Sequence, residues 1–147
     1  MFIISGCLLG DNCRYDGGNK RTDDVVEFSR SHSYIPVCPE LEGGLSTPRP
    51  PAEQQGESVF DCEGKDLTDA FTRGAELTID MIDKEAARRG EKIEGAILRK
   101  KSPSCGSGRV YDGSFSGTLI SGDGVFAGML KKRGIKIVTE DETEIFR

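Results

Sequence analysis

Short apolar runs alternate with helical patterns along this chain, and that alternation restricts its fold more than any other feature. Runs rich in β-branched and aromatic residues predict strands at Phe2–Ser5, Tyr34–Val37, Ala96–Leu98 and Ile135–Val138. Helical patterns lie between them at Asp24–Arg30, Asp69–Arg89 and Asp123–Arg133. Strands that alternate with helices favour right-handed crossovers between parallel neighbours. The sequence therefore predicts an α/β fold, a single Rossmann-like domain over residues 1–147 with a mostly parallel sheet flanked by helices.

The helix at Asp69–Arg89 is the clearest of these elements. Its apolar residues recur every three or four positions, at Phe71, Ala75, Ile79, Ile82 and Ala86. Thr68 is the expected N-cap and Gly90 the expected stop. The stretch from Cys38 to Glu53 is rich in proline and glycine and predicts irregular structure, and Ser58–Cys62 predicts a strand followed by a turn.

Charge and hydropathy exclude several classes of protein. The chain carries 25 acidic and 20 basic residues, a net charge of −5, which argues against a nucleic-acid partner because such proteins need a concentrated basic face. No apolar run approaches the roughly 18 residues of a membrane span, and the N-terminus has no signal-peptide pattern. We therefore expect a cytoplasmic protein whose cysteines are reduced.

Three of the five cysteines follow predicted strands. Cys7 comes two residues after the first strand, Cys38 directly after the second, and Cys105 in the serine-rich loop after the third. The carboxyl ends of parallel strands meet at one edge of a sheet, where such folds bind ligands, so these cysteines are expected to converge. A buried structural role is the ordinary alternative for each of them, and it is the role expected for Cys13 and Cys62. The sequence contains no Cys-x-x-Cys pair, which argues against a zinc ribbon.

Five motifs in order make the chain resemble a known family over almost its whole length. They are Cys7-Leu-Leu-Gly, Arg14-Tyr-Asp-Gly-Gly, Cys38-Pro-Glu, Gly43-Gly with Thr47-Pro-Arg-Pro-Pro-Ala-Glu53, and Lys101-Ser-Pro-Ser-Cys-Gly106. The chain resembles the DUF523 family, which includes the thiouracil desulfidases (TudS-like).

The resemblance implies a [4Fe–4S] cluster and the removal of sulfur from a thiolated pyrimidine, such as 2-thiouracil, without redox turnover. It implies Cys7, Cys38 and Cys105 as cluster ligands, without Cys13. Glu40 and Ser102 are the implied catalytic residues, although Glu42 lies close enough in sequence to compete with Glu40. Ser104 is placed with the substrate-binding residues.

Two further residues have two interpretations each. Arg49 either contacts the substrate or anchors its proline-rich loop to Glu40 or Glu53. Tyr15 is either a lid that binds substrate or part of a structural turn. His32, the only histidine, is expected at a helix end rather than in catalysis, so acid–base chemistry falls to carboxylates.

The chemistry requires an incomplete ligand set. Structural clusters usually give each of the four irons one thiolate, so three thiolates leave one iron open for the sulfur of a thiocarbonyl. Glu40 would then take a proton from the attacking water, and Ser102 would relay a proton or orient the base. The products would be uracil and sulfide. Two other functions stay open: a cluster- or zinc-binding module that senses metal or redox state without turnover, and a desulfidase of thiolated nucleosides or tRNA.

Overall fold

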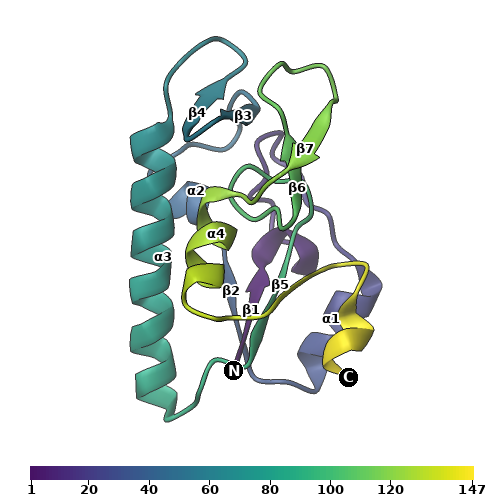
Figure 1. Cartoon of the computed structure of the whole chain (residues 1–147). Helices are drawn as coiled ribbons and strands as arrows, with labels where there is room; N and C mark the ends of the chain where they lie inside the picture. The colour runs from purple at the N-terminus through teal and green to yellow at the C-terminus, as the bar shows by residue number, and fades with distance from the viewer.

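The computed structural model describes all residues from 1 to 147 and shows an α/β architecture (Figure 1). The elements of its first half are β1 (Phe2–Ser5), the 3-10 helix η1 (Gly6–Leu9), α1 (Asp23–Arg30), β2 (Tyr34–Val37), α2 (Pro39–Glu42), β3 (Ala52–Gln55) and β4 (Ser58–Asp61). They are followed by α3 (Thr68–Arg89), β5 (Gly95–Leu98), β6 (Arg109–Tyr111), β7 (Leu119–Ser121), α4 (Val125–Lys132), β8 (Ile137–Thr139) and the 3-10 helix η2 (Thr143–Phe146).

Four strands form the central sheet in the order β2-β1-β5-β8, and every pairing in it is parallel. Ile3 of β1 lies opposite Ile35 on one side and Ala96 on the other, and Ile97 of β5 lies opposite Val138. Four of the five strands that the sequence predicted belong to this sheet, with ends that differ by at most two residues. The prediction of a parallel sheet in an α/β fold is confirmed.

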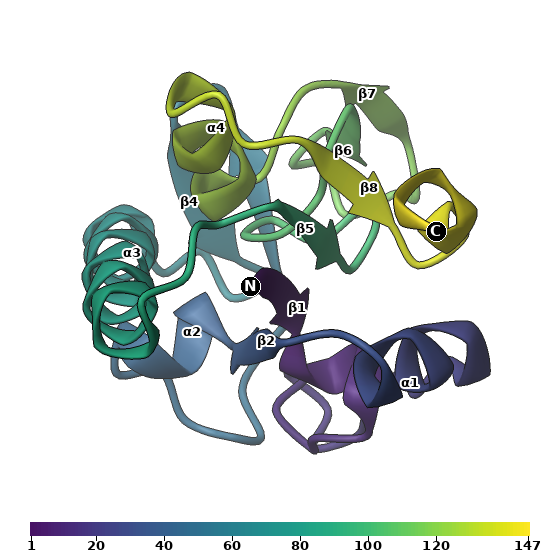
Figure 2. The same ribbon diagram turned by 90° about the horizontal axis from the view of Figure 1, so that it is seen from below.

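Helices cover both faces of the sheet, and alternating residues of β1 serve the two faces. Figure 2 shows α3 and α4 on one side of the sheet, with α1 and the C-terminal turn on the other. Ile3 packs toward α3 and α4 in a cluster that includes Ile82 and Phe126. Phe2 and Ile4 pack in the opposite cluster, where the Phe2 ring meets the Phe28 ring of α1 edge-on at 4.9 Å. Burial on both faces explains why these strands are apolar throughout.

The long helix α3 begins one residue earlier than predicted, and its cap differs. Thr68 is its first residue rather than its N-cap, a position that Leu67 occupies. The Thr68 hydroxyl instead accepts a hydrogen bond from the backbone N–H of Val59 at 2.9 Å and so ties α3 to β4. The predicted stop is confirmed, because Gly90 takes the left-handed conformation with φ of 67°.

The stretch predicted to be irregular contains a short helix, α2, directly after Cys38. Gly43, at its end, and Gly74, in α3, let the two backbones touch: a Cβ on Gly74 would collide with the Pro39 carbonyl. Proline at the first helical position is the only local signal for α2. Close packing against α3 thus fixes Cys38 and Glu40 at the end of β2.

Two hairpins, β3–β4 and β6–β7, lie beyond the end of the sheet that is opposite the N-terminus (Figure 1). The sequence predicted only the β4 part of them. No helix of the protein combines the length and the apolar character that a membrane span requires.

Candidate active site

A pocket of about 380 Å³ opens at the carboxyl end of the central sheet, between the sheet and the two hairpins. The chain passes from β1 to β2 on one side and later returns to β5 on the other, so the crossover connections diverge next to β1. Open α/β sheets bind ligands at such a point. All eight residues that the sequence analysis assigned to the site line this pocket: Cys7, Tyr15, Cys38, Glu40, Arg49, Ser102, Ser104 and Cys105.

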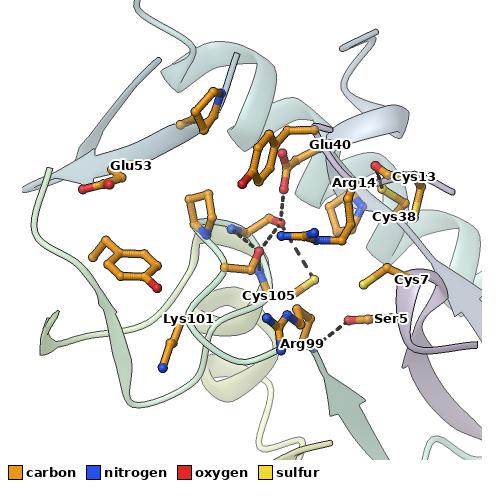
Figure 3. Close-up of a pocket in the computed structure, with 18 of the residues that line it drawn as sticks. Ser5, Cys7, Cys13, Arg14, Cys38, Glu40, Glu53, Arg99, Lys101 and Cys105 are labelled. Carbon is orange, nitrogen blue, oxygen red and sulfur yellow. Dashed lines mark hydrogen bonds between the residues drawn. The ribbon is translucent and has the colours of Figure 1, made fainter. Parts of the chain in front are cut away.

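The three cysteines reach the pocket from three different strands, and a fourth joins them. Cys7 lies in η1 after β1, Cys38 follows β2, and Cys105 follows β5, while Cys13 comes from the loop after η1 (Figure 3). None of them forms a disulfide. The sequence analysis expected a structural role for Cys13, which lies six residues after Cys7. The turn that returns Cys13 to Cys7 leaves no signal in spacing alone.

The Cys13 thiol lies beside the thiols of Cys7 and Cys38. The Cys38 thiol donates to the Cys13 carbonyl at 3.8 Å. The hydrogen bond to the Cys38 thiol lowers the pKa of Cys13, but the hydrogen bond to Cys7 and burial outweigh it and raise that pKa to about 11. The same contact with Cys13, together with burial, raises the pKa of Cys38. These thiols are therefore protonated at neutral pH when no metal is bound.

Cys105 is the most enclosed of the four, with 5% of its surface exposed. Burial raises the pKa of its thiol to about 12. The Ser104 hydroxyl lies 3.8 Å from its sulfur. A protonated thiol surrounded by apolar side chains is inert, whereas a coordinated metal would deprotonate it outright.

Glu40 is held on both carboxylate oxygens. Arg49 donates to Oε1 from Nε at 3.3 Å and from Nη2 at 3.1 Å, and the Ser104 hydroxyl donates to Oε2 at 2.8 Å (Figure 3). The two charged side chains are only 7% and 16% exposed, so the ion pair is nearly enclosed. Oε1 accepts two hydrogen bonds and Oε2 accepts one, so the free lone pair lies on Oε2. Glu40 is thus a fixed carboxylate that faces the pocket and can accept a further proton.

Ser102 acts one step further from the carboxylate than Ser104 does. Its hydroxyl lies 3.0 Å from the Ser104 hydroxyl and accepts the backbone N–H groups of Ser104 and Cys105 at 3.2 and 3.1 Å. The loop is itself fixed by α4, because Phe126 and Ala127 donate their N–H groups to the Ser104 carbonyl at 3.0 and 3.1 Å. The sequence analysis gave the catalytic role to Ser102 and placed Ser104 with the substrate-binding residues, whereas in the structure it is the Ser104 hydroxyl that contacts Glu40.

Arg49 donates its hydrogen bonds to acceptors within the protein. Its guanidinium also donates to the Cys13 carbonyl at 2.9 Å and to the Ser46 carbonyl at 3.0 Å. Its backbone N–H donates to the Tyr15 carbonyl at 2.8 Å. Of the two interpretations of Arg49, these contacts support loop anchoring to Glu40. Tyr15 lines the pocket with 38% of its surface exposed, next to the loop that Arg49 holds.

Glu42, Cys62 and His32, which the sequence analysis also considered, lie outside the pocket. Glu42 is exposed and lies outside the pocket, which favours Glu40. Cys62 is exposed in the turn after β4, so the buried role expected for it is wrong. His32 stacks on Phe28 at 3.8 Å at the end of α1, as expected for a residue without a catalytic role. Sequence reasoning did not assign Tyr111 and Phe115 to the site, because they lie on the unpredicted β6–β7 hairpin.

The basic run after β5 is mostly neutralised. Arg99 pairs with the buried Glu140, and the Lys100 ammonium lies 2.6 Å from Asp141. Glu140 also accepts the Lys100 backbone N–H at 2.9 Å. These contacts fix the beginning of the loop that carries Ser102 and Cys105.

The donor set fits an iron–sulfur cluster better than a single metal ion. No three cysteine, histidine or carboxylate side chains are arranged to hold one ion. A four-iron cluster takes one thiolate at each of several separate corners, so its ligands stand further apart than those of one ion. Soft thiolates that line one pocket without histidine are the ligand chemistry of such clusters.

Three comparisons show which known proteins this chain resembles. Residues 2–142 match the family described as 2-thiouracil desulfurase. The chain is 37% identical over 152 residues to the uncharacterized protein YbbK of Bacillus subtilis (strain 168), covering 97% of each chain. The solved structure of the [4Fe–4S]-dependent thiouracil desulfidase TudS superposes with a TM-score of 0.84 at 42% identity, covering 96% of this chain and 91% of that one. This chain belongs to the 2-thiouracil desulfurase family.

Proposed function

We propose that this protein is a [4Fe–4S]-dependent desulfidase that hydrolyses a small thiolated pyrimidine, such as 2-thiouracil, to uracil and sulfide. One observation carries the proposal: cysteines from three strand ends line the same pocket as a carboxylate fixed on both oxygens. Membership of the 2-thiouracil desulfurase family and the likeness to TudS support it.

Cys7, Cys38 and Cys105 would hold the cluster, each from the end of a different strand of the rigid sheet. When bound, the cluster supplies a thiophilic Lewis acid that draws electron density from a thiocarbonyl carbon. Cys13 is outside the three-cysteine set that the family resemblance implies, and it follows no strand of the sheet. Its thiol instead packs beside Cys7 and Cys38.

Glu40 is the general base for the attacking water. Arg49 and Ser104 fix the position of its carboxylate, and the enclosed ion pair keeps it in one orientation. A base positioned in this way removes a proton from water as the new C–O bond forms. Arg49 serves as a positioning residue, because its guanidinium hydrogens are directed at protein acceptors.

The two serines connect Glu40 to the substrate. Ser104 donates to Glu40, and Ser102 lies 3.0 Å further along, so a proton accepted by Glu40 can pass over two hydroxyls to the ring nitrogen or the departing sulfur. Water adds to carbon, the C–S bond breaks, and sulfur leaves as hydrosulfide with the bonding electron pair. No atom changes its oxidation state, so the reaction needs no electron donor.

The pocket favours a small substrate. A volume of about 380 Å³ accommodates a single heterocycle beside the cysteines. The overall charge of −5 argues against a polyanionic nucleic acid as partner. We therefore propose a free thiolated base as the substrate, with the half-exposed Tyr15 in the lining of its pocket.

The test is the reaction of anaerobically loaded holoprotein with 2-thiouracil, measured as sulfide and uracil released. We expect the two products in equal amounts without any reductant, and no release by the Cys38→Ala variant, while Cys62→Ser behaves as wild type. Holoprotein that retains its cluster but releases no sulfide from any thiolated base would instead be a binding module. Release from thiolated tRNA that free thiouracil does not inhibit would replace the free base by RNA as substrate.

A further inference from the structure

Two residues other than glycine have a left-handed backbone conformation in this protein, and both line the active-site pocket. They are Lys101, with φ of 65°, and Phe115, with φ of 56°. Lys101 leads directly into the loop of Ser102 and forms a bridge to Val110. Phe115 lies at the tip of the β6–β7 hairpin, where glycine or asparagine would be the unstrained choice. Strain that persists beside a pocket indicates a conformation that the surroundings impose for function.

The side chain of Glu53 imposes this conformation. Its Oε1 atom accepts the backbone N–H of Gly113 at 3.0 Å and that of Phe115 at 3.2 Å. Glu53 belongs to β3, which comes from the other hairpin, so the contact joins the two hairpins across the pocket wall. A carboxylate that accepts two N–H groups holds them firmly because the hydrogen bonds are charge-assisted.

Two further contacts close the hairpin tip onto β3. The Gln55 side chain donates to the Gly113 carbonyl at 2.9 Å. Gly113 itself has φ of 93°, and a Cβ there would collide with Gln55 and with the Gln54 backbone. These contacts hold the hairpin tip against β3, and Phe115 lines the pocket with 37% of its surface exposed.

Glu53 and Lys101 lie on the side of the pocket away from Cys13 and Cys38 (Figure 3). A ligand that reaches the cysteines thus has the hairpin residues at its outer side. Tyr111, on the β6–β7 hairpin, also lines the pocket. Aromatic rings bind flat heterocycles by stacking, with little dependence on which groups the heterocycle carries.

We propose that Phe115 is a substrate-binding residue that contacts the planar thiolated base from the outer side of the pocket, and that Glu53 is the positioning residue that holds it there. This inference rests on the proposed function. It assigns base recognition to the hairpins, whereas the reaction belongs to the sheet end.

The test compares Phe115→Gly, Phe115→Asn and Phe115→Tyr in reconstituted holoprotein. Gly and Asn accept the left-handed conformation but lack the ring, so KM for 2-thiouracil and Kd for uracil should both rise about tenfold, as expected for one lost stacking contact. The kcat should stay within about twofold, because no reacting group is removed. Tyr keeps the ring and should resemble wild type. Because Gly relieves the backbone, its Tm should not fall with its affinity.

Variants of Glu53 provide the second part of the test. Glu53→Ala should raise KM and Kd in the same way, because the tip loses its two N–H acceptors, whereas Glu53→Gln retains an acceptor oxygen and should be milder. Addition of the Phe115→Gly change to Glu53→Ala should produce no further rise, since both act through one ring. Ile120→Ala, at an exposed position on the same hairpin outside this pocket, is the control and should leave both constants unchanged.

Wild-type turnover with unchanged KM and Kd in Phe115→Gly and Phe115→Asn overturns this inference and leaves the proposed function intact. Wild-type holoprotein that binds uracil but releases no sulfide overturns the proposed function, and the uracil affinities of the variants still decide the role of Phe115. Wild-type holoprotein that does neither overturns both.

Discussion

The two sides of the pocket are built in different ways. On the sheet side, Cys7, Cys38 and Cys105 follow β1, β2 and β5, three neighbouring strands of a parallel sheet buried on both faces. On the hairpin side, Phe115 and Glu53 lie on two-stranded hairpins whose connection is a few side-chain hydrogen bonds. Isolated hairpins are only marginally stable, whereas strands within a covered sheet are among the most rigid elements of a fold.

This contrast suggests a division of labour. Groups that must hold a cofactor and a base in fixed positions come from the sheet, where placement is determined by the core. Groups that recognise the outer part of a ligand come from the hairpins, where small changes in sequence alter the wall without disturbing the core. Substitutions on the sheet side should therefore change cofactor content or kcat, and substitutions on the hairpin side should change KM.

The largest effect is expected for Cys105→Ala on the sheet side. Loss of one of the three ligands should remove the bound iron and abolish sulfide release, because a partly coordinated cluster dissociates. Iron content and turnover should be measured after anaerobic reconstitution. Full iron content in this variant would break the comparison, since the sheet end would then not be the cofactor site.

Glu40→Gln should reduce kcat by about 10²–10⁴-fold, because it removes the general base. The glutamine oxygen can still accept from Arg49, and its amide NH2 can donate to the Ser104 hydroxyl, so the fold, the iron content and KM should be retained. Steady-state kinetics with 2-thiouracil separate these quantities. A variant with normal kcat would assign the base elsewhere, and Glu42→Gln, on the exposed surface, provides the matched control.

A smaller effect is expected when the cluster-free protein is made alkaline. Burial raises the pKa of Cys105 to about 12, above its ordinary value of 9.0. A raised folded pKa contributes stability that is complete below the unfolded value and is lost as the pH rises toward the folded value. The Tm of the cluster-free protein should thus fall between about pH 9 and pH 12. Cys105→Ala should show a shallower fall, and equal slopes in the two proteins would contradict this account.

The smallest effect is expected for Cys13→Ser. Arg49 uses the carbonyl of Cys13 rather than its thiol, and that contact survives the substitution. Iron content should therefore match wild type in a direct metal assay. A loss of iron as large as that of Cys105→Ala would show that Cys13 is a ligand. The cofactor site on the sheet side would then contain four cysteines.

The sequence predicted the sheet side far better than the hairpin side, for a physical reason. Apolar runs such as Phe2–Ser5 are read directly because burial on both faces requires them, and the parallel order then places the residues that follow each strand at one edge. That reasoning predicted that Cys7, Cys38 and Cys105 converge, and all three line one pocket in the structure. The short helix α2 was missed because its position depends on contact between Gly43 and Gly74, which are distant in sequence.

The hairpin side could not be predicted in the same way. β6 and β7 have three residues each and stand on either side of a loop of serine and glycine, so they carry no clear alternation. Phe115 reaches the pocket only because Glu53, in the other hairpin, accepts its backbone N–H. Such a long-range polar contact leaves no periodic pattern. The same limit applies to Cys13 and to the order of Ser102 and Ser104 relative to Glu40.

The most direct test of the central claim is the iron and acid-labile sulfide content of wild-type protein prepared without oxygen. The account predicts a brown protein with about four iron and four sulfide per chain, the content of one cubane cluster. A colourless, iron-free protein after anaerobic reconstitution, or one that retains a single zinc ion instead, would contradict it.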